Sequence, residues 1–152
     1  MKHTTRRDVL QQGGAFGALV ACGLLTAQQA RAAVDGAAFE VKTLAEALKF
    51  LGGTAADSAE LSISSPDIAE NGAVVPISVT SKLPKTQEIY ILVEKNPQPL
   101  TATFTLPEGT EPFVSTRVKM GQSTNVFAVV KADGKLYSTS KETKVTLGGC
   151  GG

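Results

Sequence analysis

The chain has 152 residues, of which 42% are hydrophobic and 19% are charged, the balance of an ordinary soluble globular domain. Its formal net charge is only +1, and basic residues do not cluster outside the first seven positions. This composition argues against a nucleic-acid-binding surface of the usual basic kind and favours a single globular domain.

The N-terminus has the parts of an export signal. Arg6 and Arg7 precede an apolar run over residues 13–26, and residues 30–32 (Ala-Arg-Ala) offer the small side chains that a signal peptidase recognises. The run is shorter than the roughly 20 residues that a membrane-spanning helix needs, so no stable membrane span is expected. Residues 1–32 are therefore predicted to be a signal peptide.

The arginine pair resembles the signal for the twin-arginine export route, which carries folded proteins. Arg6 and Arg7 stand in the segment Thr-Arg-Arg-Asp-Val-Leu over residues 5–10. A competing interpretation is a lipoprotein signal, since Leu-Val-Ala-Cys over residues 19–22 would place a lipid on Cys22. Apolar residues continue past Cys22, which favours its removal with the signal. The sequence predicts a periplasmic protein exported by the twin-arginine route.

Cleavage after Ala32 would leave a mature chain with one cysteine. The signal takes away four of the fifteen basic residues and one of the fourteen acidic residues, so the net charge of the mature chain is about −2. A single cysteine cannot form an internal disulfide, and a lone thiol is unusual in an oxidising compartment. Cys150 is therefore a candidate functional residue.

The first element of the mature chain is predicted to be an amphipathic helix over residues 37–51. Its apolar residues recur at helical intervals, and Gly52-Gly53 is typical of a helix end. Residues 54–60 are expected to form a small polar linker. The residues that would line the apolar face are Phe39, Val41, Leu44, Leu48 and Leu51.

From Leu61 onward the sequence changes to short β-rich runs separated by turn residues. Asp133-Gly134 between two apolar runs is the strongest hairpin signal in the chain. In another run Val75, Ile77 and Val79 should share one face, while Ser78 and Thr80 take the other. Strands are predicted over residues 61–65, 73–81, 88–94, 100–106, 113–120, 125–131, 136–140 and 143–147.

Seven or eight strands without intervening helices predict an all-β fold, an immunoglobulin-like antiparallel β-sandwich preceded by one short amphipathic helix. The domain should span residues 33–147. Its aromatic content is low, and a sandwich of this size has a modest core. A permanent partner covering one sheet would add to its stability.

Catalytic chemistry has few candidate residues in the mature chain. The single histidine, His3, lies in the signal, so a Ser-His-Asp or Cys-His pair is impossible, and an ordinary zinc or haem site is not expected. Carboxylates such as Asp57, Glu60, Asp67 and Glu70 are scattered near turns and are interpreted as solvated surface charges. No cofactor, no metal site and no catalytic residue are predicted.

The C-terminal residues 148–152 read Gly-Gly-Cys-Gly-Gly and are predicted to be a flexible carrier arm. Gly148, Gly149, Gly151 and Gly152 leave Cys150 as the only functional side chain, and five extended residues reach roughly 16 Å. An unperturbed thiol with a pKa near 8.5 is mostly un-ionised at neutral pH, and no positive residue adjoins Cys150. The arm is thus built for access rather than for intrinsic reactivity.

Two alternative roles for Cys150 stay open at this point. It could be a handle for conjugation, or it could join two chains by a disulfide in an exported structural or adhesive sandwich. A terminal Gly-Gly also occurs in ubiquitin-like sulfur carriers, which load the final carboxylate after adenylation. That chemistry needs ATP, which the periplasm lacks.

Five segments carry a family resemblance: the arginine pair Arg6-Arg7, residues 68–76 (Ile-Ala-Glu-Asn-Gly-Ala-Val-Val-Pro), 96–100 (Asn-Pro-Gln-Pro-Leu), 117–120 (Arg-Val-Lys-Met) and 145–152 (Val-Thr-Leu-Gly-Gly-Cys-Gly-Gly). Together they resemble the SoxY family of sulfur-carrier proteins. They cover nearly the whole mature chain in the family's order, and the ending is the most specific of them, whereas residues 123–125 depart from the expected Thr-Ser-Asp.

This resemblance implies a non-catalytic carrier that holds sulfur intermediates covalently on Cys150. It also implies a heterodimer with a SoxZ-like subunit, and enzymes of the pathway that act in turn on the thiol and its cargo. SoxAX, a haem enzyme, would couple thiosulfate to the thiol, the hydrolase SoxB would release sulfate, and in some organisms the dehydrogenase SoxCD would oxidise the remaining sulfur. A Cys150-linked dimer of complexes is an expected oxidation product of an exposed thiol.

Overall fold

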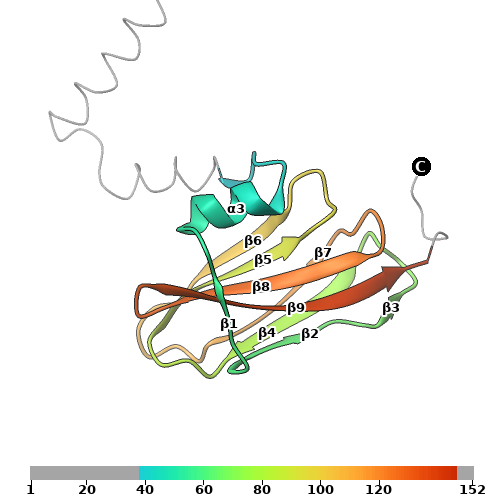
Figure 1. Cartoon of the computed structure of the whole chain (residues 1–152). Coiled ribbons are helices and arrows are strands. Elements are labelled where there is room, and N and C mark those ends of the chain that lie inside the picture. The colour runs from blue at the N-terminus through green and yellow to red at the C-terminus, as the bar shows by residue number, and fades with distance from the viewer. Residues whose placement is uncertain (1–37, 147–152) are drawn as a thin grey trace, which may run out of the picture. The chain divides into compact units, whose positions relative to one another are not determined.

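The computed structural model describes residues 38–146, which form a β-sandwich preceded by a short helix (Figure 1). The larger sheet has the strand order β1-β9-β8-β5-β6, with β3 also paired to β9, and the smaller sheet has the order β2-β4-β7. The elements are α3 (Leu44–Leu51), β1 (Ala56–Asp57), β2 (Leu61–Ser64), β3 (Ile68–Ala69), β4 (Val75–Ser81), β5 (Thr86–Val93), β6 (Leu100–Thr105), β7 (Phe113–Val118), β8 (Thr124–Ala132) and β9 (Lys135–Val145).

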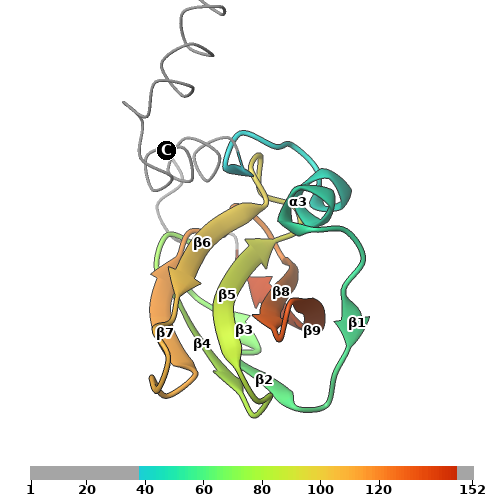
Figure 2. The same ribbon diagram turned by 90° about the vertical axis from the view of Figure 1, so that its left-hand side faces the viewer.

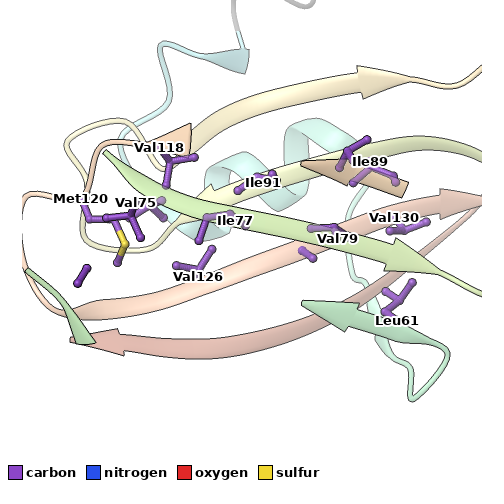
Figure 3. Packing of buried hydrophobic residues seen from close by; sticks show 14 of the residues in the cluster. Leu61, Val75, Ile77, Val79, Ile89, Ile91, Val118, Met120, Val126 and Val130 are labelled. Atoms are coloured by element: carbon purple, nitrogen blue, oxygen red, sulfur yellow. The ribbon is translucent and has the colours of Figure 1, made fainter. Parts of the chain in front are cut away.

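The all-β sandwich with one short helix before it is confirmed. The two sheets face each other, as the view along the strands shows in Figure 2, and alternate residues of their inner faces form the main core. Val75, Ile77 and Val79 all point inward and are fully buried, while Ser78 and Thr80 lie on the outer face, as predicted. Figure 3 shows these side chains packed with Ile91 and Val126 of the opposite sheet.

The predicted hairpin at Asp133-Gly134 is also confirmed. Strands β8 and β9 pair antiparallel up to Ala132 and Lys135, so the turn has two residues. Asp133 and Gly134 have φ angles of 49° and 75°, the left-handed conformation of both central residues in a type I′ turn.

The predicted helix over residues 37–51 is wrong over residues 39–43, because α3 begins only at Leu44. Thr43 is extended and caps the helix: its hydroxyl accepts a hydrogen bond from the Glu46 N–H, and the Glu46 carboxylate accepts one from the Thr43 N–H. This capping box fixes the start of the helix. Gly52, at φ 131°, ends it as predicted.

Hydrogen bonding with the Thr43 side chain, and then with the Lys42 backbone, holds the pKa of Glu46 below its ordinary value. A carboxyl group whose pKa is lowered by folding stabilises the folded state above its unfolded pKa. That contribution is lost as the pH falls through the lowered value, so the cap weakens in acid.

Thr43→Ala is expected to lower the free energy of unfolding by about 1 kcal/mol, because it leaves the Glu46 N–H without its capping acceptor. Urea denaturation would measure the loss. Thr110→Ala is the control, since Thr110 is an exposed loop residue outside any helix. Equal losses in the two variants would contradict a stabilising role for the cap.

Helix α3 covers the outer face of the larger sheet and builds a second, smaller core there. Ala47 of the helix is buried together with Leu92 and Val129 of the sheet. Phe39 and Val41, which precede the helix, pack on the same face, so the apolar spacing was a true sign of burial although these residues are not helical.

The structure corrects the predictions for β9 and for the two short strands that pair with it. The segments 136–140 and 143–147 are one continuous strand, β9, and Leu147 lies outside the described residues. The predicted linker 54–60 contains β1, and residues 68–69 form β3. Both of these short strands run parallel to β9, so the fold is not purely antiparallel. Within residues 38–146 the structure has no helix with the length and hydropathy of a membrane span.

Candidate functional site

The residues predicted to carry function lie outside the described part of the chain. These are Cys150 with its glycines Gly148, Gly149, Gly151 and Gly152, and the signal residues Arg6, Arg7 and Cys22. The structure describes the place from which the arm starts, because β9 ends at Val145 and Thr146 follows it.

The end of β9 is held on both sides by hydrogen bonds. The Val145 N–H donates to the Ser123 hydroxyl over 2.8 Å, and that hydroxyl lies 3.4 Å from the Val145 carbonyl oxygen. On the other side β3 runs parallel to β9, and the Thr146 N–H donates to the Ala69 carbonyl over 3.1 Å. The chain is therefore fixed up to Thr146, four residues before the cysteine.

A close approach of the backbone at Gly72 also helps to hold the end of β9. The Met120 N–H donates to the Gly72 carbonyl over 2.7 Å, and a side chain on Gly72 would lie 2.5 Å from the Met120 carbonyl oxygen and 2.8 Å from a methyl group of Val145. Met120 itself is buried at this end of the core, beside Val75 and Val118 (Figure 3). Any side chain at position 72 would collide with these atoms, so only glycine fits there.

A buried polar contact joins the middle of β9 to the segment before β3. The Thr143 hydroxyl, which is fully buried, donates to the Ser65 hydroxyl over 2.8 Å. The Lys141 ammonium donates to the Ser65 carbonyl over 2.6 Å and pairs with Asp67 at 3.0 Å. These contacts hold the segment that leads into β3 against β9.

The segments that resemble the SoxY family come together at this end of the sandwich. Asn96, in the turn between β5 and β6, donates through its side chain to the Lys119 carbonyl over 2.7 Å and accepts from the Gly121 N–H over 3.3 Å. The turn, the segment just after β7 and the loop that contains Gly72 thus meet near the end of β9, from which the arm starts. Sequence reasoning missed this convergence, although the same segments carried the resemblance.

The described residues give no sign of catalytic or metal chemistry. No group of three or more His, Cys, Asp or Glu residues between residues 38 and 146 could hold a metal ion. Of the scattered carboxylates, Asp57 accepts a hydrogen bond from Ser138 and Asp67 pairs with Lys141, so the structure does not bring these two into one acid/base site. What the site offers is a fixed platform at the root of a thiol-bearing tail.

Comparisons with known proteins agree on one family. The family model described as "Sulfur oxidation protein SoxY" matches residues 47–150. The solved structure of the sulfur carrier protein SoxY from Chlorobium limicola f thiosulfatophilum is 36% identical, with a TM-score of 0.63, and the match covers 71% of this chain and 96% of that one.

A more distant likeness concerns the fold alone. A single-substitution variant of the superoxide reductase (neelaredoxin) from Ignicoccus hospitalis is 16% identical with a TM-score of 0.50, over 57% of this chain and 79% of that one. No curated protein matches the chain. The family match spans well over half of the sequence, and the chain therefore belongs to the SoxY family of sulfur oxidation proteins.

Proposed function

We propose that the protein is a periplasmic, non-catalytic carrier that holds thiosulfate-derived sulfur covalently on Cys150, at the end of the arm 148–152. The observation that carries the proposal is the extent of the family match, which reaches residue 150 and so includes the cysteine. The relative from Chlorobium limicola is itself described as a sulfur carrier protein.

The chemistry proposed for Cys150 divides between the carrier and its enzymes. The thiol sulfur bonds to the outer sulfur of thiosulfate, giving a cysteine S-thiosulfonate, one proton and two electrons, and the electrons pass to a haem enzyme of the SoxAX type. Water then cleaves the terminal sulfur–sulfur bond in a SoxB-type hydrolase, giving sulfate, a persulfide on Cys150 and two protons. A SoxCD-type dehydrogenase would oxidise that persulfide where it is present.

A SoxZ-like subunit is the proposed permanent partner, and the uncovered sheet supports this part of the proposal. Helix α3 covers the larger sheet, whereas the outer face of β2-β4-β7 carries small hydroxyl side chains such as Ser78 and Ser115, which bond to each other over 2.9 Å. Phe113 is 49% exposed on β7. Among the strand residues of this face only Arg117 is charged, and depletion of charge together with an exposed aromatic ring is typical of an interface core. Export of the folded pair would use the signal at Arg6 and Arg7.

Mass spectrometry of the C-terminal peptide tests the proposal. After incubation with thiosulfate and the oxidising enzyme, the peptide that contains Cys150 is expected to gain the mass of a thiosulfate group. An unmodified peptide, or an adduct on another peptide, would refute sulfur carriage by this residue. The rival function, a structural sandwich joined through Cys150 disulfides, predicts covalent dimers and no thiosulfate adduct.

A further inference from the structure

A groove of about 590 Å³ lies beside the convergence of loops at the base of the arm. The turn between β5 and β6 forms one wall, and the segment just after β7, with Lys119 and Gly121, forms another. The residues that line it include Phe39, Asn96, Pro97, Gln98, Lys119 and Gly121.

The charge in this groove is of one sign. None of its lining residues is acidic, and Lys119 is its only charged residue. The three ion pairs between residues 38 and 146 involve Lys85, Lys131 and Lys141, so Lys119 has no ionic partner in the described chain. The groove combines an apolar wall with a free cation, which suits a small anion carried on an apolar sulfur chain.

The arm is long enough to reach the groove. Near the start of the arm, the Ser123 hydroxyl contacts Val145. Gly121, which lines the groove, is two residues before Ser123, so the Cα atoms of Gly121 and Ser123 are at most about 7.6 Å apart. Four extended residues from Thr146 to Cys150 span about 13 Å. A bound sulfur chain on Cys150 adds further reach.

A second groove of about 550 Å³ lies out of reach of the tail. It is lined by Lys131, Gly134, Lys135 and Tyr137 near the β8–β9 hairpin. Tyr137 and Val145 are eight residues apart on the same strand, which corresponds to about 26 Å. A tether of five residues from Val145 cannot cover that distance.

We infer that the groove at Lys119 is an intramolecular docking site for the sulfur-loaded tail, with the Lys119 ammonium pairing with the sulfonate end of the cargo. This inference rests on the proposed function, because the cargo must be an anionic sulfur chain on Cys150. Docking holds the S-thiosulfonate against the protein between enzymes and shelters its sulfur–sulfur bonds from stray thiols. The free thiol lacks the anionic group and has no reason to dock.

The test uses chemical loading, which needs no pathway enzyme. The Cys150 thiolate attacks an inner sulfur of tetrathionate, forming the S-thiosulfonate and releasing thiosulfate. Cystamine, by the same exchange, gives a cysteamine mixed disulfide of comparable length but positive charge, and it releases cysteamine. The sample is the purified exported protein with any partner that co-purifies. Intact-mass spectrometry confirms each adduct.

Two readouts follow the docking. The amide NMR signals of Gln98, Thr101 and Gly121 are expected to shift on thiosulfonate loading and to stay in place on cysteamine loading. Reduction of the thiosulfonate by glutathione is expected to be roughly twofold to fivefold faster in Lys119→Gln, the effect of losing one exposed ion pair. Lys135→Gln, at the hairpin end of the sandwich, is the matched control and should leave both readouts unchanged.

Unshifted groove signals, or equal reduction rates in the wild type, Lys119→Gln and Lys135→Gln, would overturn the inference. That outcome would leave the proposed function standing, since enzymatic loading of Cys150 is measured separately by mass spectrometry. Conversely, a shift that occurs equally with the cysteamine adduct would exclude recognition of the anionic cargo and overturn the inference as well.

Discussion

Replacing Cys150 with serine is expected to abolish sulfur loading completely, both by the oxidising enzyme and by tetrathionate. A serine hydroxyl cannot form the sulfur–sulfur bond on which carriage depends, and the mature chain contains no second thiol if the signal is removed at the predicted site. Mass spectrometry of the C-terminal peptide would measure the loss. The free energy of unfolding should change by less than about 0.5 kcal/mol. The last described backbone hydrogen bond of the sandwich is the one that the Thr146 N–H donates, four residues before Cys150.

Gly149→Ala is the matched control for this result, since it changes the arm by one methyl group and keeps the thiol. Tetrathionate should load it as completely as the wild type. A thiosulfate adduct that persists in Cys150→Ser would contradict the carrier assignment. An adduct lost equally in Gly149→Ala would show that the shape of the arm, rather than the thiol, decides the outcome.

Local sequence signals predicted the parts of the fold that depend on neighbouring residues. The alternation of Val75, Ile77 and Val79 indicated the correct buried face, and Asp133-Gly134 indicated the hairpin, because both depend on side-chain period and turn conformation. The helix prediction failed at its start because Thr43 and Glu46 form a capping box that the apolar spacing alone does not reveal.

The missed strands β1 and β3 have a different cause. Each is only two residues long and pairs in parallel with β9, whose residues lie far along the chain in the register pairs Ala56–Tyr137 and Ala69–Val145. Two residues carry no periodicity, and their pairing depends on where β9 lies in the finished sandwich. The thiol of Cys150 was predictable because its glycine-flanked motif is local in the sequence. The contacts of Ser123 and Gly72 with Val145 were not predictable, because they depend, like β1 and β3, on where β9 lies in the finished sandwich.

Gly72→Ala is expected to lower the free energy of unfolding by about 2 kcal/mol, within the range for inserting a methyl group into a filled site. The new methyl carbon would lie 2.5 Å from the Met120 carbonyl oxygen, a backbone atom that can move only by disturbing the Met120–Gly72 hydrogen bond. It would also press on Val145, so the root of the arm should shift. Urea denaturation would measure the loss of stability.

Gly121→Ala provides the comparison that separates this close approach from a general effect of glycine. A methyl group on Gly121 meets no atom within 4 Å, and its φ does not lie in the left-handed region. That change should be neutral or stabilising by up to about 1 kcal/mol, since alanine restricts the unfolded chain. If both variants unfold at the same urea concentration, the contact among Gly72, Met120 and Val145 does not anchor the arm. If only Gly72→Ala is weakened and its enzymatic loading also slows, the fixed root of β9 contributes to presenting Cys150.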